Sequence, residues 1–380
     1  MSHIHWVGTG LSAIPGIKRL IANGHKITVW NRTVEKAQSS LKGLSPEIQK
    51  FSIEALNSNL NKNDILISML PGDWHVPLAK ICLQKQAHFV SSSYISPEML
   101  VLNSDFKAAN LACVNEVGLD PGIDHSMAHF LVNDLKKALP QNDVSVDFIS
   151  YCGGVPKIPN PFRYKFSWSP AGVLKALKSP SKSIKNGEIW DVERPWDAIT
   201  RYTAPLPKPE EFEVYPNRDS LPFLKQYHFN PDWHVNQFVR GTLRLDGWSK
   251  AWSNVFNEIE NLTFPEGDTR LQEMSNEFWA ENAYEENEPD RVILCVSLSA
   301  KSNSETLYHK SYVLDAWGTQ ESSAMARLVS IPVATAVEAI KNGEIKPGVT
   351  SAPDSPDLVD RWMVMVESLS QHLEIVDHLQ

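Results

Sequence analysis

The sequence predicts an α/β protein in which a Rossmann-type, doubly wound parallel sheet is joined to a second α/β domain with a mixed or antiparallel sheet. Three observations lead to this prediction. Short apolar strands alternate with helices up to about residue 118, a glycine-rich turn links the first strand to the first helix, and longer strands with a two-residue period follow. A length of 380 residues suits two domains.

The first domain is predicted from apolar periodicity. Strands are expected at 3–8, 26–32, 50–53, 64–70, 88–93 and 112–117, with helices at 9–24, 33–42 and 74–86. Pro15 is compatible with the first helix because it lies near the helix start, where a missing N–H costs little. This alternation of strand and helix is typical of a parallel sheet covered on both faces.

The second domain begins with an amphipathic helix at 124–139. Strands of alternating polarity are expected at 144–154, 239–247, 291–299 and 309–318, and an acidic helical segment at 253–290. The segment 322–345 again has helical periodicity, so we expect it to return to the first domain. The predicted division is therefore 1–120 with 318–380 for the first domain, and 121–317 for the second.

Composition and charge restrict the class of protein. Of the residues, 42% are hydrophobic and 21% are charged, and the net charge of -9 argues against nucleic acid as a partner while allowing a small anionic substrate. The cysteines are scattered singly at positions 82, 113, 152 and 295, which favours a reduced chain without disulfides or a metal site. No signal peptide or membrane span is indicated, so we expect a soluble, cytoplasmic protein.

The turn after the first strand predicts a dinucleotide site. Gly8, Gly10 and Ala13 form G-x-G-x-x-A. The first glycine permits a tight turn, the second lets the backbone approach a pyrophosphate, and the small third residue allows close packing of helix and strand. The alternative is an ordinary strand-to-helix turn with convenient glycines.

The end of the second strand indicates which dinucleotide binds. NAD-binding chains usually carry an acid there, whereas this strand ends in Asn31, Arg32 and Thr33. A guanidinium pairs with the 2′-phosphate that distinguishes NADP from NAD. NADP(H) is therefore the predicted cofactor, unless Arg32 is only a solvated surface charge.

Several long motifs carry a family resemblance. They include "GTGLSAIP", "SSSYISPEM", "NEVGLDPGIDH", "NPFRYKFSWSPAGVL" and "VRGTLR". In this order they resemble the NADP-dependent, glutamate-forming saccharopine dehydrogenases, from residue 4 to about 250 and again from about 318 to 353. The fungal members carry a larger helical insertion where this chain has residues 250–290, so the presence of a third, helical subdomain stays open.

The resemblance implies an oxidoreductase of lysine biosynthesis that acts on a CH–NH bond. Because relatives form homodimers, it also implies a homodimer in which 1–120 with 318–380 form the dinucleotide-binding domain and 121–317 form the substrate-binding and dimerisation domain. It implies cofactor contacts at Thr9, Gly10, Leu11, Ser12, Asn31, Arg32, Thr33 and Leu70, and at Leu119, Asp120, Pro121, Gly122, Ile123, Asp124, His125 and Ser126. It implies substrate contacts at Ser93, Tyr94, Asp120, Arg218 and the strand around Thr242. Ser92, beside Ser93, offers another hydroxyl for the cofactor.

Arginines provide the predicted carboxylate contacts. Arg240, Thr242 and Arg244 alternate with apolar residues, so they share one face of a strand at about 6–7 Å spacing. Two guanidinium groups on that face suit a substrate with several carboxylates. The alternative is a solvated sheet face on which Arg244 pairs with an aspartate of a neighbouring strand.

The segment 115–125 supplies the candidate acid–base groups. Asp120 follows the last strand of the first domain, where open α/β sheets bind ligands, so it is the candidate for the substrate nitrogen. Asp124 precedes an apolar helical run and is expected to be its N-cap. His125 is a proton shuttle or a structural histidine, and Tyr94 is a third catalytic candidate.

Two other functions remain open. A carboxynorspermidine dehydrogenase-like imine reductase would use the same chemistry on a diamine-derived substrate, which has fewer carboxylates; the three arginines favour saccharopine. A non-catalytic NADP(H)-binding protein would bind cofactor without turnover.

Overall fold

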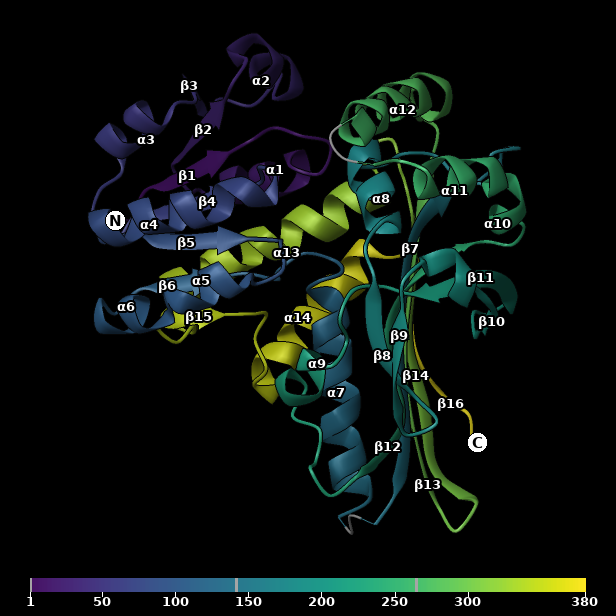
Figure 1. Ribbon diagram of the computed structural model, residues 1–380. Coiled ribbons are helices and arrows are strands. Elements are labelled where there is room, and N and C mark those ends of the chain that lie inside the picture. Colours follow the sequence, from purple (N-terminus) through teal and green to yellow (C-terminus); the bar gives the residue numbers. More distant parts are fainter. Residues whose placement is uncertain (1, 141–142, 264–265) are drawn as a thin grey trace. The chain divides into compact units, whose positions relative to one another are not determined.

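The computed structural model describes residues 2–140, 143–263 and 266–380 (Figure 1). The chain divides into two compact units. The first comprises Met1–Ser126 and Ala326–Leu358, and the second comprises Met127–Met325 and Val359–Gln380.

The first unit is built on a seven-stranded parallel sheet. Its strand order is β15-β6-β5-β4-β1-β2-β3. The strands are β1 (Ile4–Val7), β2 (Ile27–Asn31), β3 (Glu47–Lys50), β4 (Ile65–Ser68), β5 (His88–Ser91), β6 (Ala112–Val114) and β15 (Gly348–Thr350). The run β3-β2-β1-β4-β5-β6 is the order of a dinucleotide-binding sheet. The predicted Rossmann-type fold is confirmed.

Helices follow most strands of this sheet. They are α1 (Ile14–Ala22), α2 (Val34–Ser40), α3 (Ile53–Asn59), the 3-10 turn η1 (Gly72–Trp74), α4 (His75–Lys85), α5 (Pro97–Val101), α6 (Asn103–Ala108) and most of α13 (Ala324–Lys341). One predicted strand was misplaced. The segment 50–53 contains only the end of β3, and Ile53 already begins α3. β3 is an edge strand with mostly exposed side chains, so it lacks the apolar signal on which the prediction relied.

Helix α13 packs against α1 within the first unit. The backbone N–H of Gly16 donates to Ser330 Oγ at 2.9 Å, and Arg19 pairs with Glu338 at 2.9 Å. A Cβ on Gly16 would lie 2.3 Å from the Ser330 carbonyl oxygen and 2.6 Å from the Trp6 ring. The close contact between the helices therefore depends on the absence of a side chain at Gly16.

Replacing Gly16 with alanine is expected to destabilise the protein by about 1–3 kcal/mol, because an extra methyl group would force the two helices apart. Urea unfolding followed by circular dichroism measures this change. Gly72→Ala is the control, since nothing lies within 4 Å of a Cβ at that position. Equal stability of the two variants would contradict the close packing.

The second unit contains a nine-stranded mixed sheet. Seven strands run in the order β10-β11-β12-β7-β13-β14-β16, and β8 joins β12 to β9. β12 is parallel to β7 and the other pairs are antiparallel. The strands are β7 (Ser145–Pro156), β8 (Ser181–Lys185), β9 (Glu188–Val192), β10 (Thr200–Ala204), β11 (Glu210–Pro216), β12 (His234–Leu245), β13 (Asp290–Ser302), β14 (Glu305–Trp317) and β16 (His372–Asp377).

The other elements of the second unit are mainly helical. They are α7 (Ile123–Ala138, whose first residues belong to the first unit), α8 (Pro170–Leu177), the 3-10 turn η2 (Pro195–Ala198), α9 (Pro222–Gln226), α10 (Trp248–Ala251), α11 (Ser253–Glu260), α12 (Glu266–Asn282) and α14 (Pro356–Leu369). The acidic segment 253–290 was predicted to be helical, and it is so in α11 and α12 but not in 283–289. These helices contribute to an aromatic core that includes Tyr164, Trp248 and Trp252.

The end of the chain lies in the second unit. β16 pairs with β14 in antiparallel register, for example His372 with Asp315 and Asp377 with Lys310. The sequence-based division placed all of 318–380 with the first domain. Backbone pairing explains the difference, since β14 offers an open edge to β16. No helix among the described residues is long and apolar enough to span a membrane.

Candidate functional site

The turn between β1 and α1 has room for a phosphate. Gly8 has a φ of 99°, and a Cβ there would lie 3.2 Å from the Met69 carbonyl oxygen. A Cβ on Gly10 would meet nothing within 4 Å. Ala13 is fully buried next to the start of α1. These residues fit a dinucleotide, because the second glycine leaves its backbone open while the other two positions fix the turn.

The end of β2 is tied to the same turn. Asn31 Oδ1 accepts a hydrogen bond from the Thr9 backbone N–H at 3.3 Å, and Asn31 Nδ2 donates to the Thr33 carbonyl at 2.7 Å. The Thr9 hydroxyl is buried without a hydrogen-bond partner. Arg32 is exposed and follows directly. The structure therefore brings the predicted ribose-phosphate contacts next to the glycine turn, with an exposed cation beside them.

The segment after β4 also contacts the glycine turn. A Cβ on Gly8 would lie 3.3 Å from the Leu70 side chain, so Leu70 lies against the turn. The Leu70 carbonyl is 3.0 Å from Nε2 of His75. Burial lowers the pKa of His75, and its ring N–H donates to that carbonyl, which can only accept. The predicted contact Leu70 thus lies beside Gly8 and Thr9.

The chain after β6 forms a tight turn around Gly122. Gly122 has a φ of 147°, and a Cβ there would lie 2.2 Å from the Gly118 carbonyl oxygen. The Gly118 N–H donates to the Pro121 carbonyl at 2.9 Å. Only glycine fits at position 122. Ser92 packs against this turn, since a Cβ on Gly118 would lie 3.0 Å from the Ser92 Cβ.

Asp124 lies two positions further into the helix than predicted. Helix α7 begins at Ile123, so Asp124 is inside the first turn and is not the N-cap residue. Its Oδ1 accepts a hydrogen bond from the Gly122 N–H at 2.6 Å, so it still satisfies an N–H that the helix leaves unpaired. The predicted N-cap was misplaced because aspartate is favoured at several neighbouring positions of a helix start, so its presence alone does not locate the first helical residue.

His125 is fully buried between two carboxylates. Its Nε2 is 3.1 Å from Glu116 Oε2, and its Nδ1 is 3.4 Å from Asp124 Oδ2. Glu116 Oε1 also accepts the Ile95 N–H at 2.9 Å. These contacts favour the structural alternative for His125; its role in proton transfer stays a prediction.

Glu116 was missed by the sequence reasoning. Glu116 is 3% exposed and has a φ of 55°, an uncommon backbone conformation for glutamate. The sequence could have indicated Glu116 by its position in the segment 115–125, directly after β6. Its contact with His125 is evident only in the folded structure.

Two candidate catalytic residues form a hydrogen-bonded pair. The Tyr94 hydroxyl donates to Asp120 Oδ1 at 2.8 Å. The neighbouring Ser93 carbonyl accepts the Glu116 N–H at 3.0 Å, which fixes the segment after β5 against the segment after β6. Both segments follow parallel strands at the carboxyl edge of the sheet, where such sheets bind ligands.

In the second unit, the predicted alternation along β12 is present. Val239, Leu243 and Leu245 belong to one apolar core cluster. Arg240 and Arg244 lie on the other face, only 3% and 6% exposed, with Thr242 between them in sequence. The expected carboxylate-binding face is therefore largely screened from water.

The loop that carries Arg218 is fastened to β12. The Asn217 N–H donates to the Arg240 carbonyl at 2.9 Å, and the Arg240 N–H donates to Ser220 Oγ at 3.0 Å. Arg218 itself has a φ of 58°, a conformation that costs energy for residues other than glycine and is often found at functional sites. Two arginines that lie 22 residues apart in sequence are thus brought onto adjacent segments.

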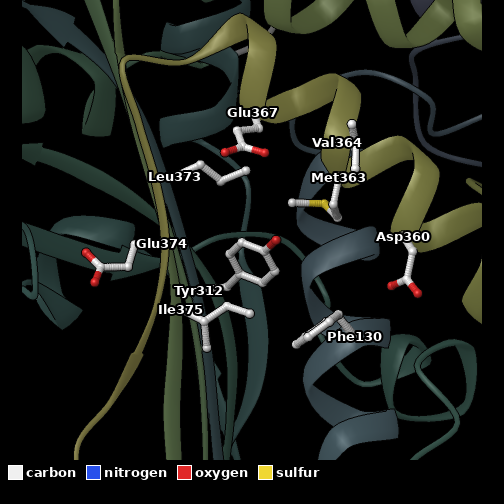
Figure 2. A pocket seen from close by; sticks show the side chains of 9 residues that line it. All are labelled: Phe130, Tyr312, Asp360, Met363, Val364, Glu367, Leu373, Glu374 and Ile375. Atoms are coloured by element: carbon white, nitrogen blue, oxygen red, sulfur yellow. The ribbon is translucent and has the colours of Figure 1, made fainter.

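A separate pocket lies elsewhere in the second unit (Figure 2). Its volume is about 340 Å³, and its lining comes from α7, β14, α14 and β16: Phe130, Tyr312, Asp360, Met363, Val364, Glu367, Leu373, Glu374 and Ile375. None of the predicted site residues lines it. It is therefore distinct from the arginine face of β12.

The parallel sheet, its strand order and the glycine turn define a Rossmann-type dinucleotide-binding protein. Residues 4–114 match the family model for the saccharopine dehydrogenase NADP binding domain, and residues 118–370 match that for the saccharopine dehydrogenase C-terminal domain. The chain belongs to the saccharopine dehydrogenase family, as its motifs predicted.

Relatives match over nearly the full length. The saccharopine dehydrogenase [NADP(+), L-glutamate-forming] of Pyricularia oryzae is 28% identical over 94% of each chain. The enzyme of the same name from Saccharomyces cerevisiae is 30% identical over 94% of this chain and 95% of its own. The apo structure of the Saccharomyces cerevisiae enzyme superposes with a TM-score of 0.82 at 26% identity, covering 99% of this chain and 100% of that one.

Proposed function

We propose that this protein is an NADP(H)-dependent saccharopine dehydrogenase of lysine metabolism. It would reduce the imine of aminoadipate semialdehyde and glutamate to saccharopine, or catalyse the reverse oxidation. The observation that carries the proposal is the face of β12, which holds two nearly buried arginines. Relatives that bear the corresponding name match along almost the whole chain, which gives independent support.

The charges of the second unit suit a substrate with several carboxylates. Two guanidinium groups lie on one largely buried strand face, and their positive charge makes Arg240 and Arg244 favour an acidic ligand over a cationic one. Saccharopine carries three carboxylates. A diamine-derived substrate would bring more ammonium groups to the same face and would be repelled.

The groups of the first unit suit the remaining chemistry. NADPH, when bound, supplies the hydride. Imine formation requires a neutral amine and the loss of water, and so a group that binds the nitrogen and moves protons. Asp120 takes this role in the proposal, with Tyr94 orienting its carboxylate through the 2.8 Å hydrogen bond.

Turnover tests the proposal directly. Oxidation of NADPH is followed with aminoadipate semialdehyde plus glutamate, and separately with aspartate semialdehyde plus diaminopropane. Turnover is expected with aminoadipate semialdehyde plus glutamate. Turnover with the second pair alone would reject the substrate, and cofactor binding without turnover by either would reject the activity.

We also propose a cytoplasmic homodimer. The four cysteines are buried as thiols and not as disulfides, which suits a reducing compartment. β16 lies at the end of its sheet and has partly exposed Leu373 and Ile375 side chains, and Val364 of α14 is 68% exposed, so apolar surface is available for a second copy. Light scattering is expected to give twice the 42.7 kDa of one chain; a mass of one chain at micromolar concentration would contradict the dimer.

A further inference from the structure

Helix α14 presents a strip of four side chains to the pocket of Figure 2. They recur at positions i, i+3, i+4 and i+7, so they share one face of the helix: Asp360, Met363, Val364 and Glu367. A carboxylate stands at each end of the strip, and two apolar side chains lie between them. Seven residues of helix span about 10 Å along the axis. The two carboxylates are therefore two turns apart on the same wall.

The rest of the lining is mainly aromatic and aliphatic. The rings of Phe130 and Tyr312 pack edge to face, with centroids 5.4 Å apart, and Leu373 and Ile375 of β16 lie beside them. Tyr312 is 8% exposed, and its hydroxyl makes no hydrogen bond within the described residues. Figure 2 shows this hydroxyl directed towards α14. A nearly buried hydroxyl without a partner is costly, so the pocket lacks a polar group that a ligand would supply.

The pocket carries negative charge without a matching cation. Its lining includes no lysine, arginine or histidine among the described residues, where Asp360 and Glu367 also have no ion pair. Glu374, a third carboxylate at the rim, lies 3.4 Å from Nε2 of His372 and points away from the other two in Figure 2. Burial raises the pKa of Tyr312 to about 12, and the charges of Glu367 and Asp360 contribute to this. The pocket therefore favours a cation.

The lining distinguishes between kinds of cation. A metal ion needs several ligands around one point, and the part of the chain that the structure describes contains no group of three or more metal-ligating residues. A volume of about 340 Å³ with an apolar strip between the charges suits an organic molecule. A free amino acid would bring its own carboxylate close to Asp360 or Glu367 and would be repelled. The ligand is therefore expected to have an apolar body and no negative charge.

We propose that this pocket binds a linear alkanediammonium ion, whose two ammonium groups pair with Asp360 and Glu367. Its methylene chain lies over Met363 and Val364. An extended chain spans roughly 1.2 Å per bond, so the nitrogens of 1,5-diaminopentane are about 7 Å apart. This length fits between carboxylates about 10 Å apart along the helix, because each accepts a hydrogen bond of about 2.8 Å. The Tyr312 hydroxyl oxygen accepts a further hydrogen bond from one ammonium, and the aromatic rings stabilise a nearby cation.

Titration of the protein with 1,5-diaminopentane at millimolar concentrations, followed by ligand-observed nuclear magnetic resonance, tests the assignment. Saturable binding is expected. Pentylamine has the same chain and one charge fewer, so its affinity should be lower by about twofold to fivefold, the usual contribution of one exposed ion pair. L-Lysine adds a carboxylate to the same diamine and should also bind more weakly. Equal affinities for 1,5-diaminopentane and pentylamine overturn the proposal, and so does the absence of saturable binding because a second copy covers the pocket.

Variants locate the site. The double variant Asp360→Asn, Glu367→Gln removes both charges from exposed positions and is expected to lower the affinity for 1,5-diaminopentane by about fivefold to twentyfold. Glu281→Gln, at an exposed position of α12 outside the pocket, is the matched control and should leave the affinity unchanged. Unchanged affinity in the double variant, or an equal loss in the control, overturns the proposal.

Two further measurements make the test independent of that double variant. Tyr312→Phe removes only the hydroxyl and keeps the ring beside Phe130, so it is expected to lower the affinity severalfold without changing thermal unfolding. Competition with magnesium ions distinguishes an organic site from a metal site. If magnesium displaces 1,5-diaminopentane at equal concentration, or if Tyr312→Phe binds as tightly as the wild type, the proposal is overturned.

Discussion

Replacing Asp120 with asparagine is expected to lower kcat/KM by about 10²–10⁴-fold, the usual contribution of a positioned acid–base group. Asparagine keeps the size of the side chain and an oxygen that accepts the Tyr94 hydroxyl, now 2.8 Å from Asp120 Oδ1. What it removes is the negative charge that binds the substrate nitrogen. Steady-state kinetics in both directions, with thermal unfolding measured in parallel, checks this result.

Matched variants separate this role from a structural one. Asp73→Asn removes an exposed aspartate of the same unit and is expected to leave kcat/KM unchanged. Tyr94→Phe removes the donor to Asp120, so its effect should have the same direction and a smaller size. If Asp120→Asn lowers the melting temperature but keeps full turnover, Asp120 belongs to the scaffold and the chemistry lies elsewhere.

Replacing Arg32 with aspartate is expected to reverse the choice of cofactor. Loss of a charged hydrogen bond to the 2′-phosphate should lower the affinity for NADPH by about 10–100-fold, and repulsion by the new carboxylate should lower it further. NADH has a 2′-hydroxyl, and it should bind the variant at least as tightly as the wild type, because a carboxylate at this position accepts a hydrogen bond from that hydroxyl. Dissociation constants for both cofactors, measured by fluorescence titration, give the ratio.

The control for Arg32 is Lys42→Asp, which changes the net charge equally at another exposed site of the first unit. A similar loss of NADPH affinity in both variants would assign the effect to overall charge. An unchanged NADPH affinity in Arg32→Asp would show that Arg32 is a solvated surface charge, the alternative that the sequence left open.

Local patterns explain why much of the fold was predictable. The glycine turn, the buried strands of the first sheet and the alternation along β12 each depend on residues close together in sequence. The position of β3 was not predicted correctly, because its side chains are mostly exposed and give no apolar signal. The pairing of β16 with β14 was not predicted, because strand partners far apart in the sequence leave no periodic signal, as with His372 and Asp315, which are 57 residues apart.

The candidate site was predictable by residue type more than by environment. The sequence indicated Asp120, Arg240 and Arg244, yet it gave no sign that the Arg244 guanidinium lies against Tyr164, 80 positions earlier in the chain. It also missed the burial of His125 between Glu116 and Asp124. Such environments arise from packing between distant segments, which composition and spacing do not encode.

A crystal structure of the protein with saccharopine and NADP⁺ bound tests the central claim most directly. The claim is that this chain recognises a tricarboxylate through its own guanidinium groups. Arg218, Arg240 and Arg244 are expected to lie at hydrogen-bonding distance, roughly 2.7–3.2 Å, from saccharopine carboxylate oxygens. Saccharopine bound with its carboxylates on other cations, and these three arginines engaged only with protein groups, would contradict the account.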